Sequence, residues 1–308
     1  MKEDKLLVSV LVPAYNHEKF VEQTILSIVH QTYGYENIEL IVIDDCSTDS
    51  TGKILKKMAD EFHFTFIQNE VNKGIVSNAN VLNKMAKGKY VSGCASDDFW
   101  HPEKIAKQVE LMESLTDDFV ICHTRAYIID EKEKFLFYQA NGINFTGDIM
   151  PEILIRNGIV APSVMKRREI YEKIGYHDEE LSFEDREMWI RISRNGYKFA
   201  YIDQPLVYRR HHVGNLGRNL SENYDTLQKI FNKHKNLYEE YNMVEEYHYT
   251  MFIIALKFNY KFAKKHFKQA RKLLIKRFPI RSLIALFIPH FFFSSTLIIK
   301  IKKVFKIW

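Results

Sequence analysis

Two pairs of adjacent aspartates, Asp44 with Asp45 and Asp97 with Asp98, are the residues whose types and spacing most clearly could do chemistry. Each pair closely follows a short apolar segment. Two neighbouring carboxylates repel each other unless a cation or strong hydrogen-bond donors lie between them. A hard divalent cation prefers oxygen ligands, so we expect one at the second pair. The first pair could accept hydrogen bonds from the N–H groups of a nucleobase.

An ordinary explanation exists for each pair. Solvated acids in a loop account for most lone acidic pairs, and capping of the next helix would account for Ser47 and Thr48. Capping does not require two adjacent acids, however. The presence of a second pair at the same edge of a sheet favours a bound cation over solvated loops.

Pro13, Ala14, Tyr15 and Asn16 form a third cluster, directly after the first apolar segment. The proline and the aromatic ring could offer main-chain groups and a stacking surface to a flat base. The alternative is an ordinary loop between a strand and a helix, with Asn16 near the helix N-cap. This cluster alone favours neither interpretation.

Two later clusters combine charged groups with the ends of predicted elements. Glu184 and Asp185 begin a predicted helix, where one carboxylate could serve as a general base or could simply complement the helix dipole. Arg210, His211 and His212 end a predicted strand, and their guanidinium and imidazole groups suit a diphosphate or a metal. An exposed basic turn is the alternative for this last cluster.

The spacing of apolar residues predicts the elements that position these clusters. Short apolar runs alternate with segments of helical spacing. The predicted strands cover 8–12, 38–43, 64–67, 90–94 and 119–129, and the predicted helices cover 18–31, 51–62, 77–86 and 102–113. This alternation is typical of an α/β fold with a mostly parallel, Rossmann-like sheet and helices on both faces. Ligands bind beyond the carboxyl ends of such strands, where the first three clusters lie.

The rest of the chain predicts a less regular region followed by helices. From about residue 135 the pattern loosens, with a helix at 184–194 and strands at 198–202 and 206–210. After residue 222 the chain is predicted to be helical. We therefore expect an α/β domain at 1–220 and a helical, basic C-terminal region at 221–308.

Charge is distributed unevenly along the chain. The sequence has 44 basic and 39 acidic residues, but the segment 257–308 contains fourteen Lys or Arg residues and no Asp or Glu. Such a basic tail points to an anionic partner. The apolar run 283–299 is 17 residues long and contains Pro289, which makes it short for a membrane span. We expect the tail to bind an anionic membrane surface without crossing it. The alternative is a helical lid packed on the α/β domain.

Other features of the sequence indicate where in the cell the protein is located. Three scattered cysteines, Cys46, Cys94 and Cys122, indicate free thiols in a reducing compartment. The N-terminal residues lack the apolar core and the cleavage site of a secretory signal. The three phenylalanines at 291–293 disfavour nucleic acid as the partner of the basic tail. We therefore expect a cytoplasmic protein that is peripheral on the inner face of the cell membrane.

Taken in order, the motifs PAYN, IDDCSTDS, NKGI, ASDD, FEDREMW and YRRHH resemble those of the family 2 glycosyltransferases of the GT-A fold. The resemblance extends from about residue 8 to residue 215. It implies that Asp98 binds a metal, with His212 as a second ligand, and that Asp185 is the catalytic base. It also implies nucleotide contacts from Pro13, Ala14, Tyr15, Asn16, Asp45 and Asp97. The secondary candidates are Asp44, Glu184, Arg210 and His211.

The resemblance implies an inverting, metal-dependent glycosyltransferase that uses Mn²⁺ or Mg²⁺. Such an enzyme would move a hexosyl or N-acetylhexosaminyl group from a nucleotide sugar, expected to be a UDP-sugar. The expected acceptor is a hydroxyl of a glycan or of a lipid-linked sugar in cell-surface polysaccharide biosynthesis. In one departure, many members carry an Arg-Asn pair where this chain has Ala79 and Asn80. A phosphate or base contact from that arginine must be lost or replaced here.

Two other functions stay open at this point. A sugar-phosphate nucleotidyltransferase on a similar sheet would need a glycine-rich loop after the first strand, which Pro13–Asn16 does not provide. A non-catalytic nucleotide-binding module, such as a two-component receiver, is much shorter than this chain. It would also leave Glu184, Asp185 and the basic turn without a role.

Overall fold

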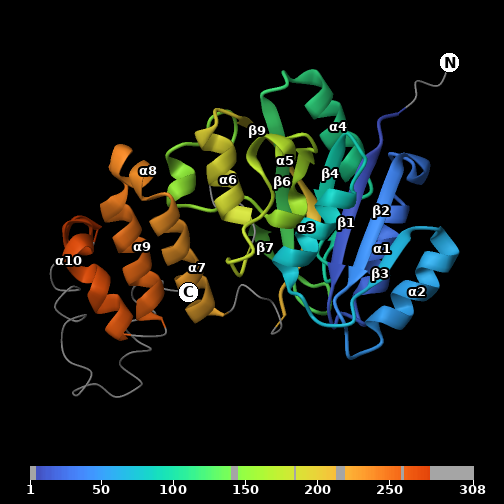
Figure 1. Cartoon of the computed structure of the whole chain (residues 1–308), viewed down its shortest axis with the longest axis horizontal. Helices are drawn as coiled ribbons and strands as arrows, with labels where there is room; N and C mark the ends of the chain where they lie inside the picture. The colour runs from blue at the N-terminus through green and yellow to red at the C-terminus, as the bar shows by residue number, and fades with distance from the viewer. Residues whose placement is uncertain (1–4, 140–144, 184, 213–218, 258–259, 278–308) are drawn as a thin grey trace. The chain divides into compact units, whose positions relative to one another are not determined.

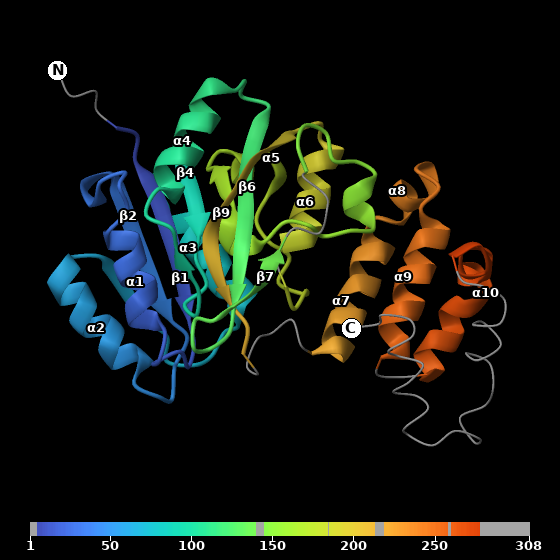
Figure 2. The same ribbon diagram turned by 180° about the vertical axis from the view of Figure 1, so that it is seen from behind.

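The computed structural model describes residues 5–139, 145–183, 185–212, 219–257 and 260–277. Glu184 and the predicted apolar run 283–299 lie outside these described residues. The chain divides into two compact units, 1–230 and 231–308. The first is an α/β structure and the second is helical (Figures 1 and 2). The functional boundary near residue 220 stays a prediction.

A mixed sheet runs through the first unit (Figure 1), with strands in the order β3, β2, β1, β4, β8, β6, β9 and β5, and with β7 paired to β6. The bounds are β1 Val8–Ala14, β2 Ile38–Asp44, β3 Thr65–Gln68, β4 Tyr90–Gly93, β5 Phe99–Trp100, β6 Phe119–Ile129, β7 Phe135–Gln139, β8 Met165–Arg167 and β9 Lys198–Arg210. Strands β3, β2, β1 and β4 are parallel, as the sequence predicts. Strands β5, β7 and β8 are antiparallel to their neighbours.

Helices cover both faces of the parallel half, because successive strand residues point to opposite faces. On one face, Val8, Val10 and Val12 of β1 pack in a core with apolar residues of α1, α2 and α4. On the other face, Leu11 of β1 packs with Leu82 of α3. The bounds are α1 Val21–Val29, α2 Thr51–Phe62, α3 Ile75–Met85, α4 Lys104–Ser114, α5 Ile170–Ile174 and α6 Asp185–Arg194. The predicted α/β fold class is confirmed.

Strand register brings the polar motifs to one edge of the sheet. Strands β1 and β2 pair in parallel up to Ala14 with Asp44, and β4 pairs with β1 up to Gly93 with Leu11. The loops after these three strands therefore begin at the same edge. This is the carboxyl edge, where ligands bind in open parallel sheets.

Strand β9 differs from the sequence-based expectation of two strands, because Lys198–Arg210 forms one continuous strand through Pro205. Proline has no N–H to donate and disturbs a ladder. The pairing of β9 with β6 shifts register next to Pro205, and such an irregularity accommodates the proline. The uninterrupted strand carries Arg210 to the loop that holds Asp98.

The second unit and the segment leading into it are helical, as predicted. The helices are α7 Leu220–Lys233, α8 Lys235–Glu240, α9 Val244–Leu256 and α10 Tyr260–Arg277. On α10, Ala263, Ala270 and Leu274 are buried. The basic residues Lys261, Lys264, Lys265, Lys268, Arg271 and Lys272 of the same helix are exposed. Among the described residues, no helix has the length and apolar character needed to cross a membrane.

Candidate active site

Asn16 joins the loops that follow β1 and β2. Its backbone is left-handed, with φ of 54°, a conformation in which asparagine is enriched. Its Oδ1 accepts the N–H of Thr48 at 2.8 Å, and its own N–H donates to Ser47 Oγ at 2.9 Å. The neighbouring Tyr15 is 43% exposed. The stacking of a base on Tyr15 stays a prediction that this exposure permits.

Asp44 and Asp45 are adjacent but face different surroundings. Asp44 is fully buried, and its Oδ2 accepts a hydrogen bond from Gln68 Nε2 at 3.2 Å. A Cβ at Gly52 of α2 would lie 2.7 Å from that oxygen, so Asp44 fits only because position 52 is glycine. Asp45 is the aspartate that reaches toward the next loop.

The Asp45 carboxylate holds the loop before α3. It accepts the N–H groups of Lys73 at 2.8 Å and Gly74 at 2.9 Å, and the side-chain amide of Asn69 at 2.8 Å. Burial raises the pKa of Asp45, but hydrogen bonds from these groups and from Asn78 outweigh it, and the pKa lies below its usual value. Asp45 is therefore an ionised carboxylate at the sheet edge, as a contact to a nucleobase N–H requires.

The end of β9 is fixed to the second aspartate pair by Arg210, which is 2% exposed. The Arg210 N–H donates to Asp98 Oδ1 at 2.8 Å, and its Nε donates to the main-chain oxygen of Asp97 at 2.9 Å. Its guanidinium also donates to Gln23 Oε1 of α1 at 2.6 Å and lies 4.6 Å from the ring centre of Phe20. Arg210 therefore makes its contacts with groups inside the protein. Its predicted contact with a diphosphate stays untested.

His17, Asp97 and His212 meet at this edge, although they come from three separate segments. His212 Nε2 lies 2.9 Å from Asp97 Oδ2, and the His17 and His212 rings are 5.7 Å apart. Burial raises the pKa of Asp97, but the hydrogen bond with His212 and the nearby His17 outweigh it, and the pKa lies below its usual value. Burial, followed by the charge of Asp97, raises the pKa of Asp98 well above normal. The ionised member of the pair is therefore Asp97.

The donor set of this triad fits a divalent metal ion. One nitrogen of each histidine and one Asp97 oxygen lie within 4.8 Å of one another. Ser96 Oγ lies 2.7 Å from His17 Nδ1, which leaves Nε2 for an ion and supplies the outer hydrogen bond typical of histidine ligands. Mg²⁺ prefers oxygen ligands, whereas a set of two imidazoles and one carboxylate also suits transition-metal ions. Asp98, the ligand predicted from the sequence, lies next in the chain.

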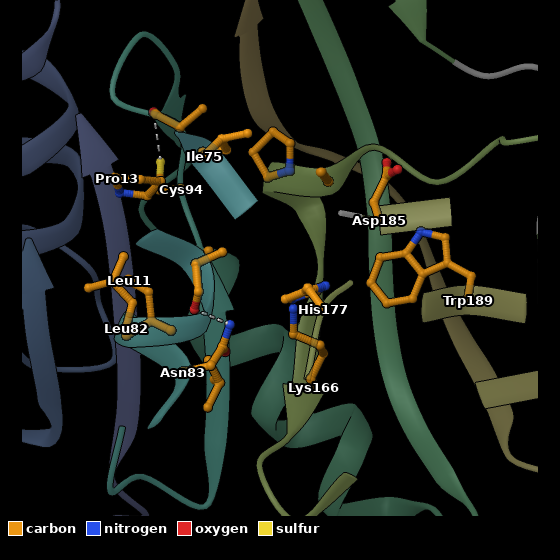
Figure 3. Close-up of a pocket in the computed structure, with 16 residues that line it drawn as sticks. Leu11, Pro13, Ile75, Leu82, Asn83, Cys94, Lys166, His177, Asp185 and Trp189 are labelled. Carbon is orange, nitrogen blue, oxygen red and sulfur yellow. Dashed lines mark hydrogen bonds between the residues drawn. The ribbon is translucent and has the colours of Figure 1, made fainter. Parts of the chain in front are cut away.

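Asp185 begins α6 and lies on a pocket that also reaches the ends of β1 and β4 (Figure 3). Its Oδ1 accepts the N–H of Arg186 at 2.6 Å, and its Oδ2 accepts Asn157 Nδ2 at 3.2 Å. Burial raises the pKa of Asp185, against the opposing effect of these two hydrogen bonds. A raised pKa makes a carboxylate a better proton acceptor. Pro13 and Ala95 line the same pocket.

Two further predicted residues lie at the ends of strands. Ala14 is buried at the end of β1. His211 is exposed, and its main-chain N–H donates to the main-chain oxygen of Ile129 at 2.8 Å. This hydrogen bond continues the pairing of β9 with β6 past Arg210.

Ala79, which stands in place of the arginine of the expected Arg-Asn pair, and Asn80, which matches the asparagine, lie on α3. Ala79 lines the pocket of Figure 3. The Asn80 side chain accepts the N–H of His177 at 2.9 Å and donates to the main-chain oxygen of the same residue at 3.0 Å. Asn80 thus serves packing in this chain.

Sequence reasoning missed two residues of the site. His17 directly follows Asn16 at the end of the first strand, so its place beside a predicted ligand loop was visible in the sequence. Nothing in the sequence marked Asn157, which holds Asp185 from a region without regular periodicity. The position of His17 could be seen in the sequence, but its meeting with Asp97 and His212 could not, and Asn157 likewise acts through a contact between distant segments.

Comparison with known proteins identifies related sequences. A family model described as glycosyl transferase family 2 matches residues 9–175. The UDP-Glc:alpha-D-GlcNAc-diphosphoundecaprenol beta-1,3-glucosyltransferase WfaP of Escherichia coli is 31% identical over 216 residues, which cover 69% of this chain and 80% of that protein. The chain spans only 26–30% of the length of three uncharacterized Rickettsia glycosyltransferases that it also matches.

Two solved structures share the fold. S. aureus TarS 1–349 in complex with UDP-GlcNAc has a TM-score of 0.64 and 21% identity, covering 82% of this chain and 74% of that one. The mannosyltransferase PcManGT from Pyrobaculum calidifontis, in complex with GDP-Man and Mn²⁺, has a TM-score of 0.61 and 14% identity, covering 99% and 88%. With its GT-A type fold and its match over more than half of its length, this chain belongs to glycosyl transferase family 2.

Proposed function

We propose that this glycosyltransferase moves a sugar from a UDP-sugar to a hydroxyl of a glycan or lipid-linked acceptor, with inversion at the anomeric carbon. The observation that carries the proposal is the pocket shared by Asp185, Pro13 and Ala95. It joins a candidate base to the ends of β1 and β4, where a nucleotide diphosphate would bind. Asp185 accepts the proton of the attacking hydroxyl, and the diphosphate leaves from the opposite side.

The nucleotide contacts follow from the loops at the sheet edge. Tyr15 offers an exposed ring to the base, and Asp45 offers an ionised carboxylate. Asp45 already accepts hydrogen bonds from Lys73, Gly74, Asn69 and Asn78, so a base N–H would replace one of these donors. Pro13, Ala14 and Asn16 shape the loop beneath the base, and Asp97 lies toward the ribose and the diphosphate.

We propose that His17, Asp97 and His212 hold Mn²⁺ and that Asp98 is the alternative ligand. When bound, the ion neutralises the charge that develops on the departing diphosphate. The support is the donor set of the triad. The fold positions these ligands. Arg210 Nε donates a hydrogen bond to the main-chain oxygen of Asp97, which holds His212, two residues later, near the Asp97 side chain.

Replacing His17 tests this ligand set against the one that contains Asp98. We expect His17→Ala to weaken Mn²⁺ binding at least about tenfold, because losing even a group that only orients a ligand costs roughly 10–100-fold. His30→Ala, a change at an exposed histidine at the end of α1, is the matched control. Binding is measured by the loss of the free Mn²⁺ paramagnetic resonance signal in the presence of UDP. Unchanged affinity in His17→Ala together with a large loss in Asp98→Asn would contradict the triad.

If Asp185 is the general base, its replacement should lower the rate of sugar transfer without changing the affinity for the donor. Asp185→Asn should lower the rate of sugar transfer by roughly 10²–10⁴, the usual cost of losing a general base, while leaving the affinity for UDP-sugar unchanged. UDP release measures turnover, calorimetry measures donor binding, and Asp60→Asn on the exposed side of α2 is the control. Near-normal turnover of Asp185→Asn would exclude Asp185 as the base and make Glu184 the next candidate.

We propose a lipid-linked acceptor in cell-surface polysaccharide biosynthesis and a location on the inner face of the cell membrane. The name of the WfaP relative includes a diphosphoundecaprenol acceptor, and such an acceptor resides in a membrane. The exposed basic residues of α10 suit an anionic leaflet, where each contributes about 1 kcal/mol.

Charge reversal on α10 tests the membrane proposal. Changing Lys264, Lys265 and Lys268 to Glu should weaken binding to anionic liposomes by at least about two orders of magnitude, because the loss of the three lysines alone removes about 1 kcal/mol each. The control reverses three exposed lysines of α2, which are Lys53, Lys56 and Lys57. Flotation with liposomes at increasing salt measures binding, and salt should weaken it. If the α10 variant floats as well as the α2 variant, this helix does not bind the membrane.

A further inference from the structure

Four aromatic residues on neighbouring strands form a row across the sheet, which we call the aromatic row. Phe99 of β5 lies opposite Tyr208 of β9, and Tyr127 of β6 lies between Tyr208 and Tyr138 of β7. The ring centres of successive members are 4.5, 4.8 and 5.2 Å apart. Residues directly opposite each other on paired strands share a face of the sheet, so all four rings lie on one face.

The aromatic row shares its face of the sheet with the pocket beside Asp185. In β6, Ile121 pairs with Lys166 of β8, which lines that pocket. Tyr127 follows Ile121 by an even number of residues, and alternate residues of a strand share a face. The chain neighbours of three row members are buried in the core on the opposite face, and they are Trp100, Ala126 and Val207.

One end of the aromatic row adjoins the candidate metal site. Phe99 directly follows Asp98 in the chain. The guanidinium of Arg210, which holds the loop of the second aspartate pair, lies 5.4 Å from the ring centre of Phe99. Neighbouring strands are about 5 Å apart, so three strand spacings place Tyr138 roughly 15 Å from Phe99. The row therefore leads from the candidate active site to the edge of the sheet at β7.

Free ring faces remain at the β7 end of the row. The rings of Phe99, Tyr208 and Tyr127 are stacked, with interplanar angles of 9° and 11°, so each covers its neighbour. Tyr138 is tilted by 43° from Tyr127 and is 48% exposed. A register shift turns Phe135 to the same face, where its ring centre lies 4.9 Å from that of Tyr138 and its side chain is 47% exposed. The stack thus supports two exposed rings.

Polar groups border these two rings. The guanidinium of Arg125 lies 5.3 Å from the ring centre of Tyr138, and its Nη1 lies 3.2 Å from Asp203 Oδ1 in an ion pair whose side chains are 31% and 65% exposed. Burial raises the pKa of Tyr127, and the neighbouring hydroxyls of Tyr138 and Tyr208 raise it further. The exposed rings therefore adjoin a planar ion pair and three phenol hydroxyls.

This mixture of groups narrows the chemistry of the ligand. A pyranose sugar has a C–H face that can stack on an aromatic ring, and its hydroxyls can pair with charged and phenolic side chains. The acyl chains of a lipid would cover the ion pair without giving it polar partners. An exposed aromatic patch marks a binding surface, and this patch is continuous with the candidate active site. A sugar chain fits both its composition and its place.

We propose that Phe135 and Tyr138 bind a sugar of an oligosaccharide acceptor, remote from the hydroxyl that reacts beside Asp185. This inference rests on the proposed function, because it gives the acceptor of that reaction a second contact. The length of the aromatic row separates the two contacts, so a single sugar cannot make both. The enzyme therefore distinguishes acceptors by their length.

Binding of glycans of different length tests the proposal. The probes are laminarihexaose, chitohexaose and maltohexaose, each compared with the methyl glycoside of its own sugar in the presence of UDP and Mn²⁺. Titrations followed by saturation-transfer NMR give the affinities. We expect at least one hexaose to bind at least about fivefold more tightly than its methyl glycoside, because the hexaose can also contact an aromatic anchor. If no hexaose binds more tightly than its methyl glycoside, the proposal is wrong.

Variants of β7 locate the second contact. Phe135→Ala and Tyr138→Ala should each weaken hexaose binding at least about fivefold, the lower range for truncating an aromatic anchor, and leave the methyl glycoside unaffected. Tyr138→Phe should keep most of the affinity, because the ring remains. The matched control is Phe137→Ala, on the same strand and 50% exposed, because Phe137 pairs with Ile128 on the opposite face. Equal losses in Phe137→Ala and Tyr138→Ala would overturn the proposal.

Two further readouts separate this inference from its alternatives. Sedimentation velocity tests whether the face binds a second copy of the chain: if Phe135→Ala and Tyr138→Ala change the oligomeric state but not hexaose binding, the proposal fails. UDP binding with Mn²⁺ and the melting temperature are recorded for every variant. If UDP binds and the variants bind the hexaose normally, this inference alone fails. If UDP does not bind to the wild-type protein, the proposed function fails as well.

Discussion

The buried guanidinium of Arg210 is the interaction on which the rest of the site depends. A buried charge is tolerated only when its donors are paired, and Arg210 satisfies its donors with groups from separate segments, including Asp97 O and Gln23 Oε1. Its main-chain N–H takes one oxygen of Asp98. The end of β9 is thereby fixed against the loop after β4. His212, two residues later, can then meet Asp97.

The two carboxylates of each aspartate pair have different surroundings. Asp98 is tied to the main chain and its pKa is raised, whereas the ionised Asp97 faces the two histidines. In the first pair, Asp44 is buried against Gly52, and Asp45 is ionised beside the loop before α3. Both members of the first pair support the structure, since Asp45 holds the loop before α3, whereas in the second pair only Asp98 is tied to the main chain of Arg210.

Most of the fold and the place of the site could be predicted from the sequence, because both follow from local patterns. The spacing of apolar residues predicted the strands and helices of the parallel half. The tendency of ligands to bind beyond the carboxyl ends of parallel strands predicted the edge of the sheet at which the site lies. The continuation of β9 through Pro205 could not be predicted, because its pairing with β6 overrides the local preference of proline. Likewise, the meeting of His17 with Asp97 and His212 depends on the packing of segments far apart in the chain. The charge pattern of the sequence also cannot show whether Arg210 is buried and hydrogen-bonded inside the protein or binds a phosphate.

The most direct test of this account is a crystal structure with UDP and Mn²⁺, in which anomalous diffraction at the manganese edge locates the ion. The account predicts one strong peak among His17, Asp97 and His212, with the diphosphate next to it and the base near Tyr15 and Asp45. A diphosphate bound at the same edge with its manganese on Asp98 and away from both histidines would contradict the proposed ligands. UDP bound anywhere other than the carboxyl edge of the sheet would contradict the account as a whole.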